Sequence, residues 1–320
     1  MTAALFLTAY VALASTAGAT ALRRARWAQA APRWGVGAWQ ALTGSIVLAG
    51  LLAAPALALC MLPLRVPVAD LVGLTPLEVA RHYEPAGGDW IGVAALVGAA
   101  LVVSVVAGRT VGNVRRATRV RREQLATLAL VGHPHPDGYT VLDHASPVVY
   151  CLPGRGRTVV VSRGALDLLS PSELRLVLGH ERTHLRARHD IALAFSDALA
   201  RTFSWVPVFR LSHRQISMLV EMQADDTARA GQDRRSLAHA LITLSAGRRP
   251  DAALAAASND AVARVRRLTS PDVAVPRLHK LGIACGVLAV LVLPLGLALA
   301  PALEASSVGC CEVAGLEPHP

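Results

Sequence analysis

Two histidines and a glutamate in the segment GHERTH (179–184) have the residue types and the spacing of a zinc site. On a helix, His180 and His184 lie one turn apart on the same face, so both imidazoles can reach one zinc ion at about 2.0–2.1 Å. Glu181 is rotated by about 100° around the helix axis, so its carboxylate is better placed to take a proton from a water molecule at the metal than to bind the metal. The HExxH pattern therefore predicts zinc-dependent hydrolysis with Glu181 as the base.

A catalytic zinc ion with two histidine ligands needs a third protein ligand. The downstream segment EMQAD places Glu221 and Asp225 four residues apart, so that a helix presents both on one face. Glu221 can complete a His-His-Glu set, and Asp225 can accept the other ring N–H of a zinc-bound histidine. The metzincin pattern is excluded, because it requires Gly at position 187 and His at position 190, where the chain has Ala187 and Asp190.

The helix that should position the two histidines has a marked beginning. In the segment SPSEL, Ser170 is a good N-cap, Pro171 takes the first helical position and Glu173 completes a capping box. The sequence predicts a helix from Pro171 to about Asp190. HExxH alone arises by chance in long chains, and a Glu and an Asp four residues apart usually form a solvated face. Their combination with a capped helix favours a zinc site.

The sequence does not identify the group that stabilises charge in the transition state. We expect His189 near the end of the histidine helix, as a cation or as a partner of a ligand, and not as a ligand itself. The candidates for the stabilising donor, which the sequence leaves unranked, are Arg182, His189, His213 and Arg214.

Strand signals precede the histidine helix. The stretches VVYCL (148–152) and TVVVS (158–162) flank the turn PGRG, which predicts a β-hairpin. Before them, residues 109–128 are expected to form a basic helix.

Further helices are expected after the histidine helix. The apolar segment Ile191–Phe209 either completes the core or contacts the membrane, and the sequence leaves both readings open. Another helix is expected from Ser212, as its N-cap, to Gly231, followed by a helical region up to about Arg267.

Four apolar runs dominate the rest of the chain, which has 320 residues, 53% of them hydrophobic. Each run is close to the roughly 20 residues that a helix needs to cross a bilayer. Three lie within residues 1–108 and one lies near the C-terminus: Thr2–Leu22, Val36–Leu62, Trp90–Gly108 and Leu281–Leu303. The first run is not expected to be a signal peptide, because arginines follow it and no positive charge precedes it. We therefore expect four transmembrane helices.

Positive charge alternates with these runs as the positive-inside rule requires. Four Arg and no acidic residue separate the first two runs, two Arg and four acidic residues separate the next two, and six Arg and one Glu follow the third. We therefore expect both termini outside, residues 109–280 in the cytoplasm and a short external tail at 304–320. The net charge of +10 is interpreted as topology and contact with anionic membrane lipid, and not as direct nucleic-acid binding.

Cysteines do not suggest a second metal site. The chain has five, and no two have Cys-x-x-Cys spacing, which argues against a cysteine zinc site. The role of the adjacent Cys310 and Cys311 stays open.

The chain resembles the BlaR/MecR antirepressor family of membrane-embedded metallopeptidases. The resemblance rests on GHERTH (179–184), on VEMQADDTA (220–228) and on the position of HExxH between the third and fourth spans. The hairpin and the stretch VVVSRGALDLLSPSEL also resemble the segment before HExxH in this family and in the related HtpX-type proteases. The resemblance covers nearly the whole chain, and it implies that the VVYCL edge binds substrate by β-augmentation.

The resemblance also implies a gluzincin-like zinc endopeptidase with His180, His184 and Glu221 as ligands and Glu181 as the base. Sensor members continue after the fourth span into a penicillin-binding domain, whereas here 17 residues follow Leu303 and no Ser-x-x-Lys pattern of that kind occurs. We therefore expect no direct β-lactam sensing and infer no small-molecule ligand. By analogy, the protein substrate is a transcriptional repressor of the BlaI/MecI type, or the chain itself.

These features together predict an α-helical integral membrane protein with four transmembrane helices and a cytoplasmic, mainly α (α+β) zincin-like metalloprotease domain. Two alternatives remain. The first is an HtpX-like protease for quality control of membrane proteins. The second is a non-catalytic signalling or binding module, against which the presence of Glu181 argues, since a structural zinc site has no use for a base. The oligomeric state, the activating signal and the cleavage sequence are not predicted.

Overall fold

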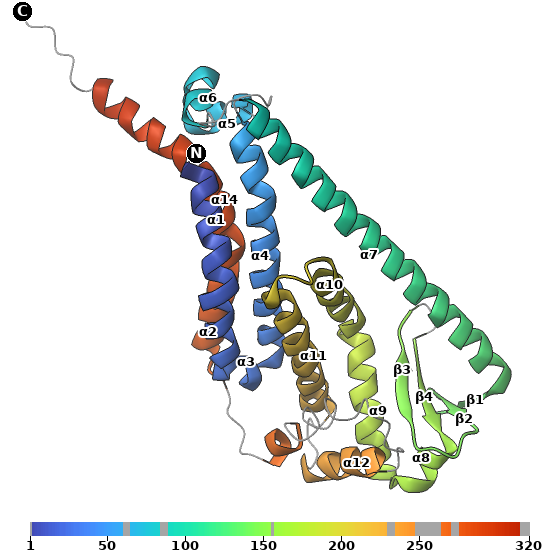
Figure 1. Cartoon of the computed structure of the whole chain (residues 1–320). Coiled ribbons are helices and arrows are strands. Elements are labelled where there is room, and N and C mark those ends of the chain that lie inside the picture. The colour runs from blue at the N-terminus through green and yellow to red at the C-terminus, as the bar shows by residue number, and fades with distance from the viewer. Residues whose placement is uncertain are drawn as a thin grey trace, which may run out of the picture.

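The fold combines a bundle of long helices with a small sheet that lies at the far end of one of them (Figure 1). The computed structural model describes residues 2–59, 65–83, 89–154, 157–228, 234–246, 264–269 and 275–313.

Four helices in this described part are long and apolar enough to cross a membrane: Thr2–Arg24, Pro32–Ala58, Trp90–Val131 and Arg277–Glu304. They correspond to the following elements: α1 (Thr2–Leu13), the π-helical turn η1 (Ala14–Gly18) and α2 (Ala19–Arg24); α4 (Pro32–Ala58); α7 (Asp89–Val131); and α14 (Arg277–Val313). In Figure 1, α1, α4 and α14 run side by side, and α7 diverges from them to reach the sheet.

Short helices connect the long ones. Between α2 and α4 lies α3 (Arg26–Ala30), and between α4 and α7 lie α5 (Arg65–Val72) and α6 (Pro76–Tyr83). Side chains of α5 and α6 bury against α1 and α4 and so close one end of the bundle (Figure 1).

The apolar helices agree with the predicted runs, but their ends differ. The third run and the predicted basic helix form one continuous helix, α7. The fourth continues past Leu303 to Val313, so residues 304–313 of the predicted tail are helical, and 314–320 lie outside the described residues. Apolar side chains along α7, such as Val97 and Leu101, are 63% and 64% exposed, as expected of a surface that meets lipid. The side of the membrane on which each loop lies stays a prediction.

A four-stranded sheet in the order β1-β2-β4-β3 packs beside the histidine helix. Its strands are β1 (Gly132–His135), β2 (Tyr139–Leu142), β3 (Val149–Leu152) and β4 (Thr158–Ser162). The β3–β4 pair is antiparallel, with Tyr150 opposite Val160, which confirms the predicted hairpin. The β2–β4 pair is parallel, and β3 is left at the edge of the sheet. One face of the sheet buries Val159 and Val161 against α9.

The remaining helices surround the sequence-predicted site. They are α8 (Arg163–Leu168), α9 (Pro171–Arg186), α10 (His189–Thr202), α11 (Pro207–Ala228), α12 (Arg234–Ala246) and a short helix at 264–269. Helix α11 packs along α4, where the fully buried Trp39 meets an apolar cluster that includes Ile216 and Leu219. A helix expected to carry a metal ligand is therefore anchored to an apolar helix of the bundle.

Two predicted helix boundaries are wrong, and one apolar segment is divided between two helices. The histidine helix ends at Arg186 and not at Asp190, because Arg188 adopts the left-handed conformation (φ 54°) and a new helix starts at His189. The segment Ile191–Phe209 is split between α10 and α11, and it contributes to the core described above.

The helix predicted to begin at Ser212 begins five residues earlier, at Pro207. Ser212 is therefore a buried interior residue and not an N-cap. Its predicted end at Gly231 and most of the helical region expected up to Arg267 lie outside the described residues.

Candidate metal centre

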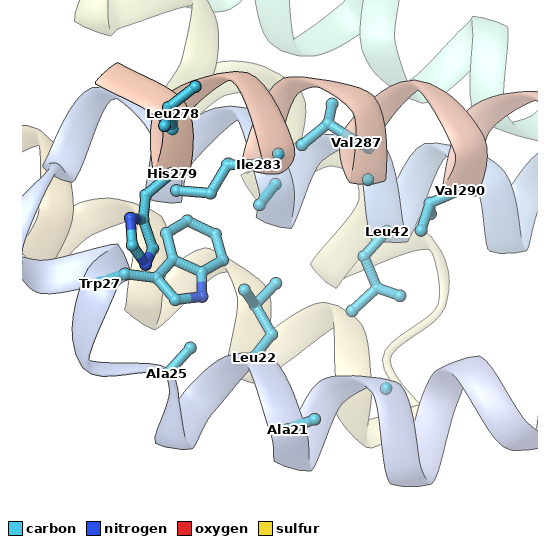
Figure 2. Close-up of a pocket in the computed structure, with 15 residues that line it drawn as sticks. Ala21, Leu22, Ala25, Trp27, Leu42, Leu278, His279, Ile283, Val287 and Val290 are labelled. Carbon is cyan, nitrogen blue, oxygen red and sulfur yellow. The ribbon is translucent and has the colours of Figure 1, made fainter. Parts of the chain in front are cut away.

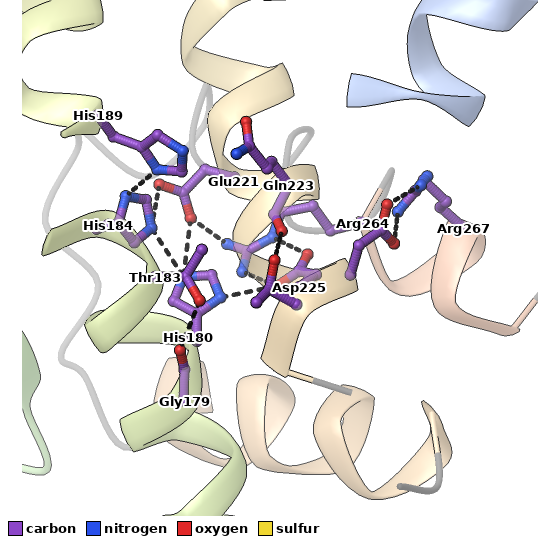
Figure 3. A network of polar contacts seen from close by, with 12 residues as sticks. Gly179, His180, Thr183, His184, His189, Glu221, Gln223, Asp225, Arg264 and Arg267 are labelled. Atoms are coloured by element: carbon purple, nitrogen blue, oxygen red, sulfur yellow. Dashed lines mark hydrogen bonds and ion pairs between the residues drawn. The ribbon is translucent and has the colours of Figure 1, made fainter. Parts of the chain in front are cut away.

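Helix α9 presents His180 and His184 because its N-terminus is fixed and one of its faces is buried. The capping box is formed as predicted: the Glu173 N–H donates to Ser170 Oγ at 3.3 Å, and the Ser170 N–H donates to Glu173 Oε2 at 2.9 Å. Such a cap contributes about 1 kcal/mol to stability. The Nε2 atoms of the two histidines point toward each other at 3.1 Å (Figure 3). Both rings are largely withdrawn from solvent, with 7% and 13% of the side chains exposed.

Glu221 reaches the same point from α11. Its Oε2 lies 3.4 Å from His180 Nε2, and its Oε1 lies 3.5 Å from His184 Nε2. One ligand atom from each of these three residues lies within 4.8 Å of the other two. Two imidazole nitrogens and one carboxylate oxygen form the donor set of many catalytic zinc sites, which leave the fourth position open. The chemistry and the convergence of these donors fit a zinc ion.

Asp225, one turn after Glu221 on α11, lies behind His180. Its Oδ1 is 3.0 Å from His180 Nδ1, the ring nitrogen that faces away from Glu221. Asp225 is 1% exposed. A buried carboxylate in this place fixes the orientation and the tautomer of a metal-binding histidine. Asp225 is therefore in contact with His180, and its role behind a metal ligand stays a prediction.

Arg264, which the sequence reasoning missed, completes the arrangement. Its Nε and Nη2 donate to Asp225 Oδ2 and Oδ1 at 2.8 and 2.7 Å, and its Nη1 lies 3.0 Å from Glu221 Oε2 (Figure 3). The guanidinium group thus neutralises the buried carboxylate of Asp225 and the half-buried carboxylate of Glu221, and holds both in place.

A parallel ion pair lies next to this one. Arg267 makes two hydrogen bonds of 2.7 Å to Asp226, and its Nε donates to the carbonyl of Gln29 at 3.2 Å. Two arginines one turn apart therefore clamp two consecutive aspartates of α11. The adjacent aspartates and the two arginines are visible in the sequence. A single sequence, however, does not show that segments 39 residues apart pair with each other.

His189 differs from its predicted role as a cation at the helix end. It begins α10, is 3% exposed, and its Nδ1 lies 2.9 Å from His184 Nδ1. It is therefore a partner of His184, which was the other predicted reading.

The remaining donor candidates make other contacts. Arg182 donates to the carbonyl of Asp137, and His213 Nδ1 lies 2.9 Å from Ser196 Oγ. Arg214 is exposed on α11. Of the four candidates, His189 is the one with a hydrogen bond to a predicted ligand in the described part of the chain.

Glu181 faces a cavity of about 210 Å³ between α9, α11 and the sheet. The cavity is lined by Val149, Val177, His180, Glu181, Glu221, Leu241, Leu244 and Arg264. The Glu181 carboxylate accepts hydrogen bonds from the thiol and the backbone N–H of Cys151 on β3. Burial raises the pKa of Glu181 above its ordinary value, although the nearby His180 opposes the shift. Burial also raises the pKa of Cys151 to about 12, so its thiol keeps the proton that it donates.

The pKa values of the two histidines predicted to bind the metal shift in opposite directions. Burial alone would lower the pKa of His180, but Asp225 and Glu221 outweigh it and raise that pKa to about 9. Burial lowers the pKa of His184 to about 4. Burial would raise the pKa of Glu221, but the hydrogen bond from His180 and the charge of Arg264 lower it to about 2. At neutral pH the metal-free cluster therefore holds one extra proton, on His180.

Comparison with known families identifies part of this region. Residues 114–218 match Peptidase family M48. The matched segment is about a third of the chain, contains α9 with its two histidines, and ends before Glu221. Comparisons with curated proteins and with solved structures gave no match. The match supports a metallopeptidase of the zincin-like, membrane type.

Proposed function

We propose that this chain is an integral-membrane zinc endopeptidase. The observation that carries the proposal is the convergence of His180, His184 and Glu221 within 4.8 Å, beside the half-buried carboxylate of Glu181. The match of residues 114–218 to Peptidase family M48 supports the class of reaction, and the four apolar helices support the membrane location.

In this proposal, His180, His184 and Glu221 hold the zinc ion. When bound, zinc polarises the scissile carbonyl and lowers the pKa of water. Glu181 takes the proton of the attacking water and passes it to the leaving amine. The raised pKa of Glu181 suits both steps, because a stronger base takes the proton more readily and still releases it to an amine.

The chain's own contacts keep these groups in position. The Cys151 thiol and amide hold the Glu181 carboxylate, and Asp225 orients the ring of His180. Arg264 ties Asp225 to Glu221, so the two groups on α11 keep a fixed relation to each other. This network is built from buried and half-buried side chains, and its mutual contacts hold the site close to one geometry.

In this proposal, the peptide substrate binds along β3. This strand is at the edge of the sheet and packs beside α9, and its Val149 lines the cavity that contains Glu181 (Figure 1). An extended peptide can add to such an edge as a further strand, with its backbone hydrogen-bonded to β3. Endopeptidase activity on an extended segment follows from this mode of binding.

The proposed biological role is regulatory proteolysis on the cytoplasmic side of the cell membrane. The basic residues after the third span support this orientation, with both termini outside. The BlaR/MecR resemblance supports a BlaI/MecI-like transcriptional repressor, or the chain itself, as the substrate. Membrane lipid surrounds the apolar helices, and no direct contact with nucleic acid is proposed.

A second candidate function is quality control by an HtpX-like protease. The family match covers the strands and the histidine helix and fits either role. A non-catalytic binding module is disfavoured, because Glu181 is held beside the ligands by the Cys151 thiol and amide, which a structural zinc site does not need.

The test compares cleavage by the wild type and by Glu181→Gln, with Arg175→Gln as a matched control at an exposed position of α9. Each full-length protein is purified in detergent and incubated with fluorescein-labelled casein and, separately, with a folded repressor of the BlaI/MecI type. We expect cleavage by the wild type and the control and none by Glu181→Gln. Cleavage restricted to the repressor supports the regulatory role, and cleavage of casein supports quality control. Equal cleavage by Glu181→Gln would overturn the proposal.

A further inference from the structure

A second and larger cavity lies between the apolar helices, away from the metal centre. It has a volume of about 750 Å³ and opens between the first two apolar segments and α14. Its walls are made of apolar and small side chains from η1 to α4 on one side and from residues 278–290 of α14 on the other (Figure 2). Trp27 and His279 lie together at one end of the cavity, and Val290 lies toward the other.

Glycines on α14 leave this space empty. A Cβ atom added at Gly282 or at Gly286 would meet no atom within 4 Å. Both residues line the cavity, and they are one turn apart on the same face of the helix. The space is therefore a gap between helices that no side chain of the described chain fills, and a leucine at either position would enter it without disturbing the backbone.

The length of the cavity matches one leaflet of a bilayer. From Leu278 to Val290 the helix rises about 18 Å, and half of the hydrocarbon core is about 15 Å thick. An apolar gap within spanning helices does not hold water well, because its walls offer few polar partners. A hydrocarbon chain of one leaflet has the length and the polarity to fill it.

Charge at the end marked by Trp27 and His279 indicates the kind of lipid. Arg24 and Arg26 flank Ala25, which lines the cavity. On α14, Arg277 and Lys280 flank the first two lining residues, 278 and 279. All four cations are exposed. No carboxylate lines the cavity among the described residues. A tryptophan at this level is typical of the membrane interface, where headgroups lie.

We propose that this cavity binds one anionic phospholipid, with an acyl chain between α4 and α14 and the headgroup phosphate among the four cations. The lipid would fill the gap between α14 and the segment from α2 to α4, and so complete the packing of the bundle. The inference rests on the membrane location of these helices and not on peptidase activity. Zinc content and lipid binding therefore report on the two proposals separately.

The test measures lipid retention by the full-length protein in detergent micelles, by native mass spectrometry during titration with phosphatidylglycerol or with phosphatidylcholine. We expect the wild type to retain one phosphatidylglycerol. Gly286→Leu, which fills the cavity, should weaken this binding at least tenfold. Gly296→Leu is the matched control, because Gly296 lies on the same helix, has an equally open Cβ position and does not line the cavity. It should bind as the wild type does.

The charge requirement is tested with Arg26→Gln combined with Lys280→Gln. Loss of two cations should weaken binding of phosphatidylglycerol on the order of 30-fold and leave that of phosphatidylcholine nearly unchanged. Three results would each overturn the proposal: wild-type binding by Gly286→Leu, equal binding of the two lipids by the wild type, or a dimer that excludes lipid and is broken by Gly286→Leu. The last result would assign the cavity to a second copy of the chain. Unchanged zinc content in every variant verifies that the fold is intact.

Discussion

Replacing Asp225 by Asn removes the negative charge behind His180, a proposed zinc ligand, and changes the shape of the side chain little. The wild-type carboxylate lies 3.0 Å from His180 Nδ1 and accepts two hydrogen bonds from Arg264, at 2.7 and 2.8 Å. Asn keeps one acceptor oxygen but no charge. His180 then loses its orienting anion, and Arg264 keeps a charged partner in Glu221.

The loss of a carboxylate behind a metal-binding histidine typically weakens metal binding by about 10- to 100-fold, or roughly 1.4–2.7 kcal/mol. A second effect opposes it, because Asp225 also helps to raise the pKa of His180 to about 9. Without Asp225 this pKa falls, and the proton that competes with zinc leaves more easily. We therefore expect the full loss of affinity for Asp225→Asn at about pH 9.5 and a smaller loss at pH 7.

The assay is competition for zinc with a chelator of known affinity, at both pH values, on the full-length protein in detergent. Asp226→Asn is the matched control, because Asp226 is the next residue and pairs with Arg267 instead. The control should bind zinc as the wild type does. If Asp225→Asn bound zinc as tightly as the wild type at about pH 9.5, Asp225 would not act on the zinc affinity through His180.

Three further predictions follow from the same contacts. Arg264→Gln should lower the free energy of unfolding of the metal-free protein by about 3 kcal/mol, because the buried Asp225 loses its cation and the half-buried Glu221 adds a smaller, solvent-screened loss. Denaturation in detergent should show a smaller decrease in the free energy of unfolding when zinc is bound, since the zinc ion neutralises the charge of Glu221. The zinc affinity of the wild type should rise about tenfold per pH unit from pH 6 to 9, because zinc must displace the proton on His180. Isothermal calorimetry in two buffers should show about one proton released per zinc bound at pH 7. A zinc affinity that does not change with pH would contradict the raised pKa of His180. Ser170→Ala should lower the free energy of unfolding by about 1 kcal/mol and leave zinc affinity unchanged; a large loss of affinity would mean that the cap also positions the histidines.

Local signals explain what the sequence predicted well. The spacing of His180, His184, Glu221 and Asp225 is read on single helices, where neighbours four residues apart share a face. The capping box at Ser170 is likewise contained within four residues. The long apolar runs and the hairpin around PGRG also depend on short stretches of chain. Each of these features is decided by interactions between residues that are close in sequence.

What the sequence did not predict depends on contacts between distant segments. The histidine helix stops at Arg186 although neither Gly nor Pro follows, because the packing of α10 on α11 favours a turn through a left-handed Arg188. That turn brings His189 to His184. Arg264 meets Asp225 only after the chain has returned to α11. Such pairings depend on tertiary packing, which overrides local propensity.

We expect His180, His184 and Glu221 to bind one zinc ion beside the proposed base Glu181. The zinc content of the purified full-length chain tests this arrangement most directly, measured by elemental analysis for the wild type, Glu181→Gln and Glu221→Ala. One zinc per chain is expected in the wild type and in Glu181→Gln, and far less in Glu221→Ala. A wild type that contains no zinc and takes up none when it is supplied would show that these three residues do not form a zinc site.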